Sequence, residues 1–388
     1  MSSDGESTWI VKRISTLRYH WRRNILKYII LILALSSVIP HSNKPLILTV
    51  NRTIGQFCYI TYLDSGLLRI PNDAYDLRFG NITRESPEIW DDHHQSFLRN
   101  AYPVPVHSHN DYWRRIPLFE ALGSGCISVE ADIWLRHDDL LVGHGSKGLD
   151  KKITLRSLYL DPLQRIFESQ NAQSKDGSWR GVYNRAPNQT LVLLVDLKTS
   201  GSPDTFNELY DQLQPLRDLD YLTYWNGTDR IMRPLTVVAT GSTDFKYVLD
   251  LNSTHRDIFW DAKLERLFDV GQDDFSTDPP TFKYNQSNSY YASTQFKNAI
   301  LHPLPRNDEK WYTDNPQNVD IASSQPQQAE ARGLLTRYWD TPTHPPNLKE
   351  TTWRVLINSN VGVLNMDDLG TVRERAKGWG RLNQEEEL

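Results

Sequence analysis

Cysteine is scarce in this chain: its 388 residues include two, Cys58 and Cys126. Two cysteines are too few for a disulfide-stapled scaffold or for a cysteine-rich zinc module. An excess of positive charge is missing too, because 43 lysines and arginines face 48 aspartates and glutamates, which gives a formal net charge of −5. This overall balance gives no indication of a nucleic-acid partner.

Strong overall hydrophobicity is also absent. The mean hydropathy of −0.56 excludes a polytopic membrane protein, although an average can hide one apolar segment. With 39% hydrophobic, 11% aromatic and 23% charged residues, the composition is that of a globular protein. The length fits one large domain with an extension or two ordinary domains.

One local apolar segment lies near the N-terminus. Residues 1–27 carry six basic and two acidic side chains, and residues 28–39 follow without any charge. This run is shorter than the ~17 residues that a spanning helix needs, but Ile25, Leu26 and a snorkelling Lys27 extend it. We therefore expect a signal anchor, with the basic flank cytoplasmic and the rest of this membrane-associated protein luminal or extracellular.

A cleaved secretory signal and a mitochondrial presequence are the alternatives to an anchor. The short apolar run fits the first, and the arginine-rich, acid-poor start fits the second. Six Asn-X-Ser/Thr sequons follow the apolar run and support a secreted or luminal glycoprotein. They begin at Asn51, Asn81, Asn188, Asn226, Asn252 and Asn285.

Short apolar runs recur from residue 101 to about residue 370. They are Val104–Val106, Cys126–Leu135, Leu191–Leu197, Leu235–Ala239, Ile258–Trp260, Tyr290–Ala292, Gly333–Tyr338 and Val361–Met366. Several are continuous, which is typical of strands buried on both faces of a parallel sheet. Helix-compatible stretches such as Pro117–Leu122 and Pro203–Leu216 lie between them. The pattern predicts an α/β protein, a (β/α)₈ TIM barrel over residues 101–370.

The rest of the chain divides around this barrel. Residues 1–42 form the basic and apolar N-terminal segment, and residues 43–100 an elaboration with strands expected at Leu46–Val50 and Phe57–Tyr62. Residues 270–330 contain a long loop-rich insertion, and residues 371–388 form a polar C-terminal tail.

Acidic residues gather where two predicted strands end. Glu130 and Asp132 are two apart and share a face of the second strand, and Asp196 and Lys198 do so on the third. In a TIM barrel these strand ends meet at the site of chemistry. We predict that Glu130, Asp132 and Asp196 hold Mg²⁺ or Ca²⁺ and that Lys198 offers its charge to a phosphate. A solvated outward carboxylate pair and an ordinary Asp196–Lys198 ion pair are the structural alternatives.

Histidines occur at the same predicted end of the barrel. The first strand ends in His107-Ser108-His109-Asn110-Asp111, where His107 and His109 share one face. His144 follows a predicted hairpin that returns the chain toward the mouth. An oriented histidine pair beside a cation is suited to acid–base chemistry on a phosphate.

These residues resemble the phospholipase-C-like phosphodiesterases, which include phosphatidylinositol-specific phospholipase C and glycerophosphodiester phosphodiesterase. The resemblance rests on Ser108–Tyr112, Glu130-x-Asp132 and His144, with a His-Asn pair as in phospholipase C. Together with Arg337–Pro342 and Asn365–Asp367, the order of motifs over residues 100–370 resembles the fungal altered inheritance of mitochondria protein 6 family.

The resemblance implies a phosphoric diester hydrolase of lipid metabolism that acts on a phospholipid or glycerophosphodiester. It implies His109 and His144 as the general acid and base, with Asn110, Glu130, Asp132 and Asp196 as metal ligands. We expect Lys198, His107 and Trp339 to contact substrate. Asp196 departs from the family pattern, where a longer glutamate is common.

Two other functions compete with phosphodiester hydrolysis. One is a catalytically silent, membrane-held barrel that binds phospholipid headgroups or a protein. The other is an amidohydrolase-type zinc enzyme, which the His107-Ser108-His109 run would fit. Such a zinc site needs further histidines on the middle strands, and the sequence does not supply them there.

Overall fold

The computed structural model describes residues 101–172, 178–200, 203–267, 273, 281–300, 324–344, 346–369 and 372. The predicted N-terminal segment, the elaboration at 43–100 and, apart from Val372, the tail at 371–388 lie outside these residues. Within the described part of the chain, no helix is long and apolar enough to cross a membrane.

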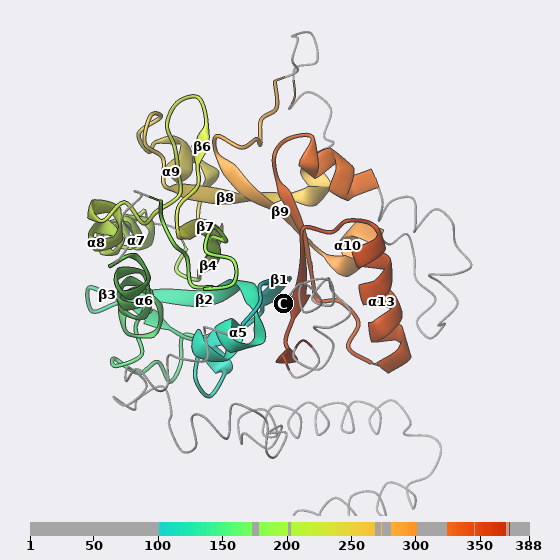
Figure 1. Ribbon diagram of the computed structural model, residues 1–388, viewed down its shortest axis with the longest axis horizontal. Helices are drawn as coiled ribbons and strands as arrows, with labels where there is room; N and C mark the ends of the chain where they lie inside the picture. Colours follow the sequence, from blue (N-terminus) through green and yellow to red (C-terminus); the bar gives the residue numbers. More distant parts are fainter. Residues whose placement is uncertain are drawn as a thin grey trace, which may run out of the picture. The chain divides into compact units, whose positions relative to one another are not determined.

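Eight parallel strands form a closed barrel (Figure 1). In order around the barrel they are β1 (Val104–Ser108), β2 (Cys126–Arg136), β4 (Leu191–Leu197), β7 (Leu235–Gly241), β8 (Ile258–Lys263), β9 (Ser289–Gln295), β10 (Leu335–Trp339) and β11 (Val363–Met366). The sheet closes because β1 pairs with both β11 and β2. Each predicted apolar run overlaps one of these strands, which confirms the predicted TIM barrel.

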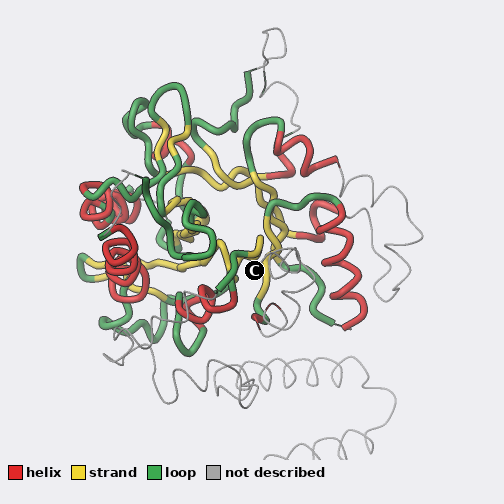
Figure 2. The backbone as a smooth tube through the Cα atoms, viewed as in Figure 1, coloured by secondary structure: helices red, strands yellow, loops and turns green. Residues whose placement is uncertain are grey.

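Helices surround the barrel, as Figure 2 shows. They include α5 (Phe119–Ser124), α6 (Asp161–Asn171), which continues a π-helical turn η5 (Arg156–Leu160), α7 (Asp204–Gln212), α8 (Gln214–Asp218), α9 (Phe245–Leu249), α10 (Phe296–Ile300) and α13 (Pro346–Asn358). The helix expected at 203–216 is split between α7 and α8, because Pro215 lacks the N–H needed to continue α7. The helix expected at 117–122 runs to Ser124 and ends at Gly125, whose φ of 88° favours glycine.

The inner face of the barrel changes character along the strands. Near the N-terminal ends it is apolar, with Val192, Leu194 and Phe259 in one buried cluster. Two residues further along the same strands stand Asp196 and Asp261. Because side chains alternate along a strand, these carboxylates share the inward face with the apolar layer and lie above it. The barrel is therefore a packed core with a polar mouth.

A hairpin follows β2 and brings the chain back to this mouth. Strand β3 (Asp139–Val142) pairs antiparallel with β2 through a turn in which His137 and Asp138 have φ angles of 54° and 61°. Two successive positive φ angles are the signature of a type I′ turn. Beyond β3, the Gly143 N–H donates to the Asp132 carbonyl at 3.0 Å, which places the next residue, His144, beside the β2 carboxylates.

Candidate active site

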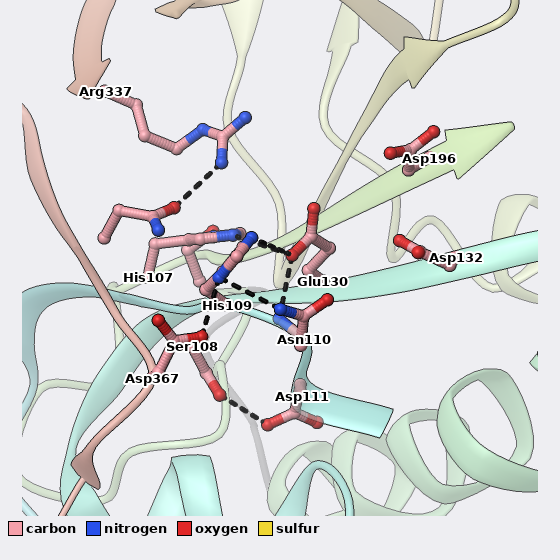
Figure 3. Close-up of polar contacts among 12 residues, drawn as sticks. His107, Ser108, His109, Asn110, Asp111, Glu130, Asp132, Asp196, Arg337 and Asp367 are labelled. Carbon is pink, nitrogen blue, oxygen red and sulfur yellow. Dashed lines mark hydrogen bonds and ion pairs between the residues drawn. The ribbon is translucent and has the colours of Figure 1, made fainter. Parts of the chain in front are cut away.

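Three carboxylates from neighbouring strands meet at the mouth of the barrel. Glu130 and Asp132 extend from β2, and the strand register sets Asp132 directly opposite Asp196 of β4. One oxygen from each group lies within 4.8 Å of the others. All three line a cavity of about 490 Å³ (Figure 3 draws the side chains). The shared inward face predicted for Glu130 and Asp132 is present.

The crowding of negative charge changes the titration of Asp132. Burial raises its pKa to about 6, with further contributions from the charges of Glu130 and Asp196. Lys198 opposes this effect, since its Nζ lies 2.9 Å from Asp132 and 2.6 Å from Asp196. Lys198 thus forms the Asp196–Lys198 ion pair that was the structural alternative to phosphate binding, and it also lines the cavity.

The acidic cluster fits a hard divalent cation. Its ligands are carboxylate oxygens, which Mg²⁺ and Ca²⁺ prefer. Asp196 Oδ1 is buried and has no hydrogen-bond partner among the described residues, so one oxygen is free for a ligand. Asn110, the fourth predicted ligand, lines the cavity, and its Oδ1 lies 2.6 Å from the Tyr112 hydroxyl oxygen.

His109 projects from the end of β1 between two carboxylates. Its Nδ1 lies 2.7 Å from Asp367, and its Nε2 lies 3.7 Å from Glu130. Burial works against protonation of His109, but the charges of Glu130 and Asp367 outweigh it and raise the histidine pKa. Burial alone would raise the pKa of Glu130, but His109 and the other positive neighbours of this carboxylate lower it by more. The neighbouring carboxylates therefore favour the protonated form of His109.

His144 lies against the other side of the acidic cluster. Its Nδ1 is 3.1 Å from Asp132 Oδ2 and 3.1 Å from the Tyr112 hydroxyl, which itself donates to Asp132. The Trp113 ring lies 5.2 Å from the imidazole, centroid to centroid. The side chain is 59% exposed. Both predicted acid–base histidines thus line one cavity, and each has a carboxylate at Nδ1.

The structure corrects the prediction that His107 contacts substrate. The side chain is fully buried, and it is not among the residues that line the cavity. Its Nδ1 is hydrogen-bonded to Ser128 at 2.7 Å, and burial lowers its pKa to about 4. His107 faces inward like His109, but it lies one layer deeper in the barrel. Trp339, by contrast, lines the cavity and is 36% exposed.

Sequence reasoning missed a buried cationic centre across the cavity. Arg337 of β10 donates to Asp261 at 3.2 Å, to Asn365 at 2.9 Å and to Ser293 at 3.1 Å. Asp261 stands near the end of β8, so the strand-end rule that identified Asp196 could have found it. Tyr112 and Asp367 lie within the motifs that carry the family resemblance, but spacing alone gave neither a role.

Gly241 provides a test of the space around Asp196. A Cβ at this position would lie 1.9 Å from Asp196 Oδ1, whereas one at Gly148 would have nothing within 4 Å. Both glycines have positive φ angles, so alanine costs backbone strain of about 1–2 kcal/mol at either position. We expect Gly241→Ala to weaken the binding of a divalent cation at least about tenfold, because it displaces the Asp196 carboxylate from the acidic cluster.

Isothermal titration calorimetry of Gly241→Ala, with Gly148→Ala as the matched control, would measure this effect. Equal cation affinity in the two variants would show that Asp196 does not take part in binding.

Cation affinity should also depend on pH in a defined direction. A cation needs the ionised form of Asp132, so below the pKa of about 6 a proton must leave first. The dissociation constant should then rise about tenfold for each pH unit below 6 and level off above it. Titrations between pH 5 and pH 8 measure this slope, and an affinity that is flat across pH 6 would contradict the proposed ligand set.

Comparisons with known proteins are consistent with this geometry. The sequence profile described as the AIM6-like phosphodiesterase domain matches residues 95–261. The altered inheritance of mitochondria protein 6 homolog of Arthroderma benhamiae is 35% identical over 294 residues, which are 72% of this chain and 85% of that protein. The altered inheritance of mitochondria protein 6 of Eremothecium gossypii is 34% identical over 278 residues, 69% of this chain and 68% of its own.

Among solved structures, the phosphatidylinositol-specific phospholipase C from Listeria monocytogenes matches this chain. The match covers 72% of this chain and 94% of that one, with 10% sequence identity and a TM-score of 0.37. The family assignment rests on the sequence relatives. By its identity to them and the length of the match, this chain belongs to the altered inheritance of mitochondria protein 6 family, with its AIM6-like phosphodiesterase domain.

Proposed function

We propose that this chain is a phosphoric diester hydrolase that acts on a phospholipid or glycerophosphodiester with the help of a divalent cation. The observation that carries the proposal is the placement of two imidazoles, His109 and His144, on either side of an acidic cluster in one cavity. Each ring has a carboxylate at Nδ1, which fixes its orientation and directs Nε2 toward a reacting group.

The two histidines support opposite proton transfers. In the neutral tautomer of His144 whose Nδ1–H donates to Asp132, Nε2 carries no proton and can accept one. The raised pKa of His109 favours the protonated ring, which can donate one. In the first step, His144 accepts the proton of a substrate hydroxyl as its oxygen attacks phosphorus. His109 then protonates the leaving oxygen as the ester bond breaks.

A second step completes the hydrolysis. The first step yields a cyclic phosphodiester, with His144 protonated and His109 neutral. His109 can then accept a proton from water as the water oxygen attacks phosphorus, and His144 returns its proton to the oxygen released from the ring. When bound at the acidic cluster, Mg²⁺ or Ca²⁺ supplies positive charge that neutralises the phosphoryl oxygens.

We infer the compartment and the membrane partner from the N-terminal sequence. A basic flank and an uncharged run at residues 28–39 support a membrane-associated protein with its barrel on the luminal or extracellular side. Secretion and mitochondrial import are the alternatives, and the electrophoretic mobility of the protein before and after deglycosylation distinguishes the glycosylated routes from the mitochondrial one.

An assay of the purified full chain tests the reaction. Glycerophosphodiesters, phosphatidylinositol and sphingomyelin would be offered in detergent, with added Mg²⁺ or Ca²⁺ and with EDTA. We expect cleavage of at least one substrate, its loss in EDTA and its recovery when the cation is restored. Binding without turnover would favour the silent barrel, and Zn²⁺-dependent cleavage of an amide or lactone would favour an amidohydrolase.

A further inference from the structure

A second cavity adjoins the acidic one at the mouth of the barrel. It has a volume of about 480 Å³ and lies between the loop after β7, the end of β8 and Tyr284. Trp260 and Lys263 line both cavities, so the two share a wall. A ligand that extends from the acidic cluster past the end of β8 would enter this second cavity.

Two cations on its wall lack carboxylate partners. Lys263 ends β8, and Arg266 ends the short 3₁₀ helix η6 (Leu264–Arg266); both side chains are exposed. Within the described part of the chain, neither forms an ion pair. Of the nearby acids, Asp244 also lines the second cavity, where it accepts a hydrogen bond from the Lys246 N–H and caps α9, and Glu265 lines the first cavity. Lys263 and Arg266 are therefore available to an anionic ligand.

Aromatic rings give this cavity a firm wall. The Phe245 ring centroid lies 5.7 Å from that of Trp260 and 5.0 Å from that of Tyr284, so the three rings pack together. Aromatic faces suit the carbon skeleton of a polyol or glycerol group, while the nearby cations suit its charge. This combination differs from the first cavity, where acidic groups predominate.

The charges of the two cavities complement different parts of one ligand. In the first cavity, Lys198 is paired with Asp132 and Asp196, and Arg337 is paired with Asp261. A second anionic group placed there would meet the acidic cluster, and the single cation of its lining without an ion pair among the described residues is Lys263, which the two cavities share. In the second cavity, Lys263 and Arg266 offer two positive charges that form no ion pair among the described residues.

We propose that the second cavity binds a further anionic group of the substrate, held by Lys263 and Arg266, while the scissile phosphate lies at the acidic cluster. This inference rests on the proposed function and specifies its substrate class: phosphodiesters whose headgroup carries a second phosphate. The same headgroup chemistry can belong to a membrane lipid or to a soluble glycerophosphodiester.

Binding of bisphosphates tests the proposal without requiring turnover. Calorimetry of the full chain with Mg²⁺ would compare glycerol 3-phosphate with alkanediol bisphosphates of increasing chain length. We expect one bisphosphate to bind at least about tenfold more tightly than the monophosphate, as a second charge-assisted contact allows. Arg266→Ala, which changes the second cavity alone, should remove most of this advantage and leave monophosphate binding unchanged, and Lys263→Ala should also remove most of the advantage.

Lys246→Ala is the matched control, because Lys246 is an exposed lysine on neighbouring α9 that pairs with Asp250 outside the cavity. It should retain the full advantage. The proposal is overturned if no bisphosphate exceeds the monophosphate, or if the advantage survives in both cavity variants. If simple phosphodiesters are cleaved but no bisphosphate binds more tightly than the monophosphate, the second binding site is contradicted and the proposed function is not. If a bisphosphate binds more tightly but no substrate is cleaved, the proposed function is contradicted and the second site is not.

Two further assays separate the sources of the headgroup. Cleavage would be compared for glycerophosphoinositol 4-phosphate in solution and for phosphatidylinositol 4-phosphate in phosphatidylcholine vesicles. A preference of the parent protein for the vesicles, lost in Arg266→Ala, assigns the site to a lipid headgroup, and the reverse preference assigns it to a soluble diester. Equal rates for the 4-phosphates and their unphosphorylated counterparts would contradict the inferred specificity.

Discussion

Alanine in place of His109 is expected to lower kcat for phosphodiester cleavage by about 10³-fold, within the usual range for loss of a general acid or base. The imidazole links Asp367 to the wall of the acidic cavity, and no other described residue replaces its Nε2 in that position. Because alanine removes the proton donor but none of the three cluster carboxylates, KM and cation affinity should change much less than kcat.

His144→Ala should cause a loss of similar size, and the double variant should be only slightly worse than either single one. Residues that act in one proton-transfer sequence give strongly non-additive effects. His255→Ala is the control, because that exposed ring stacks on Tyr224 at 4.2 Å and does not line the cavity. Steady-state kinetics on the best substrate would measure all four proteins. A loss below about tenfold in either single variant would exclude the assigned role.

The barrel could be predicted because its strands appear in the sequence as short, distinct apolar runs. A run such as Leu191–Val195 is apolar at every position, which only a strand buried on both faces needs. The acidic cluster could be predicted from simple geometry. Residues two apart on a strand point to the same face, and the parallel strands of a barrel bring their C-terminal ends together. Asp132 and Asp196 even stand directly opposite one another.

Contacts between distant strands could not be predicted in the same way. The Arg337–Asp261 pair joins residues 76 positions apart, and it depends on a barrel closed in the correct register. The depth of His107 depends on the register too, since a shared face does not say which layer reaches the cavity. Periodicity gives the direction of a side chain, whereas closure of the sheet gives its neighbours.

Loss of the Arg337–Asp261 pair should cost considerable stability, because it is among the most buried ionic contacts of the described residues. Both side chains are at most 5% exposed, and the guanidinium also donates to Ser293 and Asn365. Arg337→Met leaves the Asp261 carboxylate buried without its positive partner. Breaking such a buried pair costs about 3–5 kcal/mol, which urea unfolding of the variant would measure. Arg337→Met with Asp261→Asn should recover part of this loss, because no unpaired charge then remains.

An exposed arginine pair provides the control for this substitution. Arg156 and Asp161 lie at the same 3.2 Å separation, but their side chains are 48% and 46% exposed, so Arg156→Met should cost at most about 1 kcal/mol.

The pH dependence of stability should also differ between Arg337→Met and this control. Burial raises the pKa of Asp261 and Arg337 lowers it. Without the guanidinium, the folded state takes up a proton at a pH at which the unfolded chain is still ionised, so the deficit of Arg337→Met should shrink as the pH falls toward the ordinary pKa of an aspartate. A deficit independent of pH would mean that lost packing, rather than an unpaired carboxylate, causes the destabilisation.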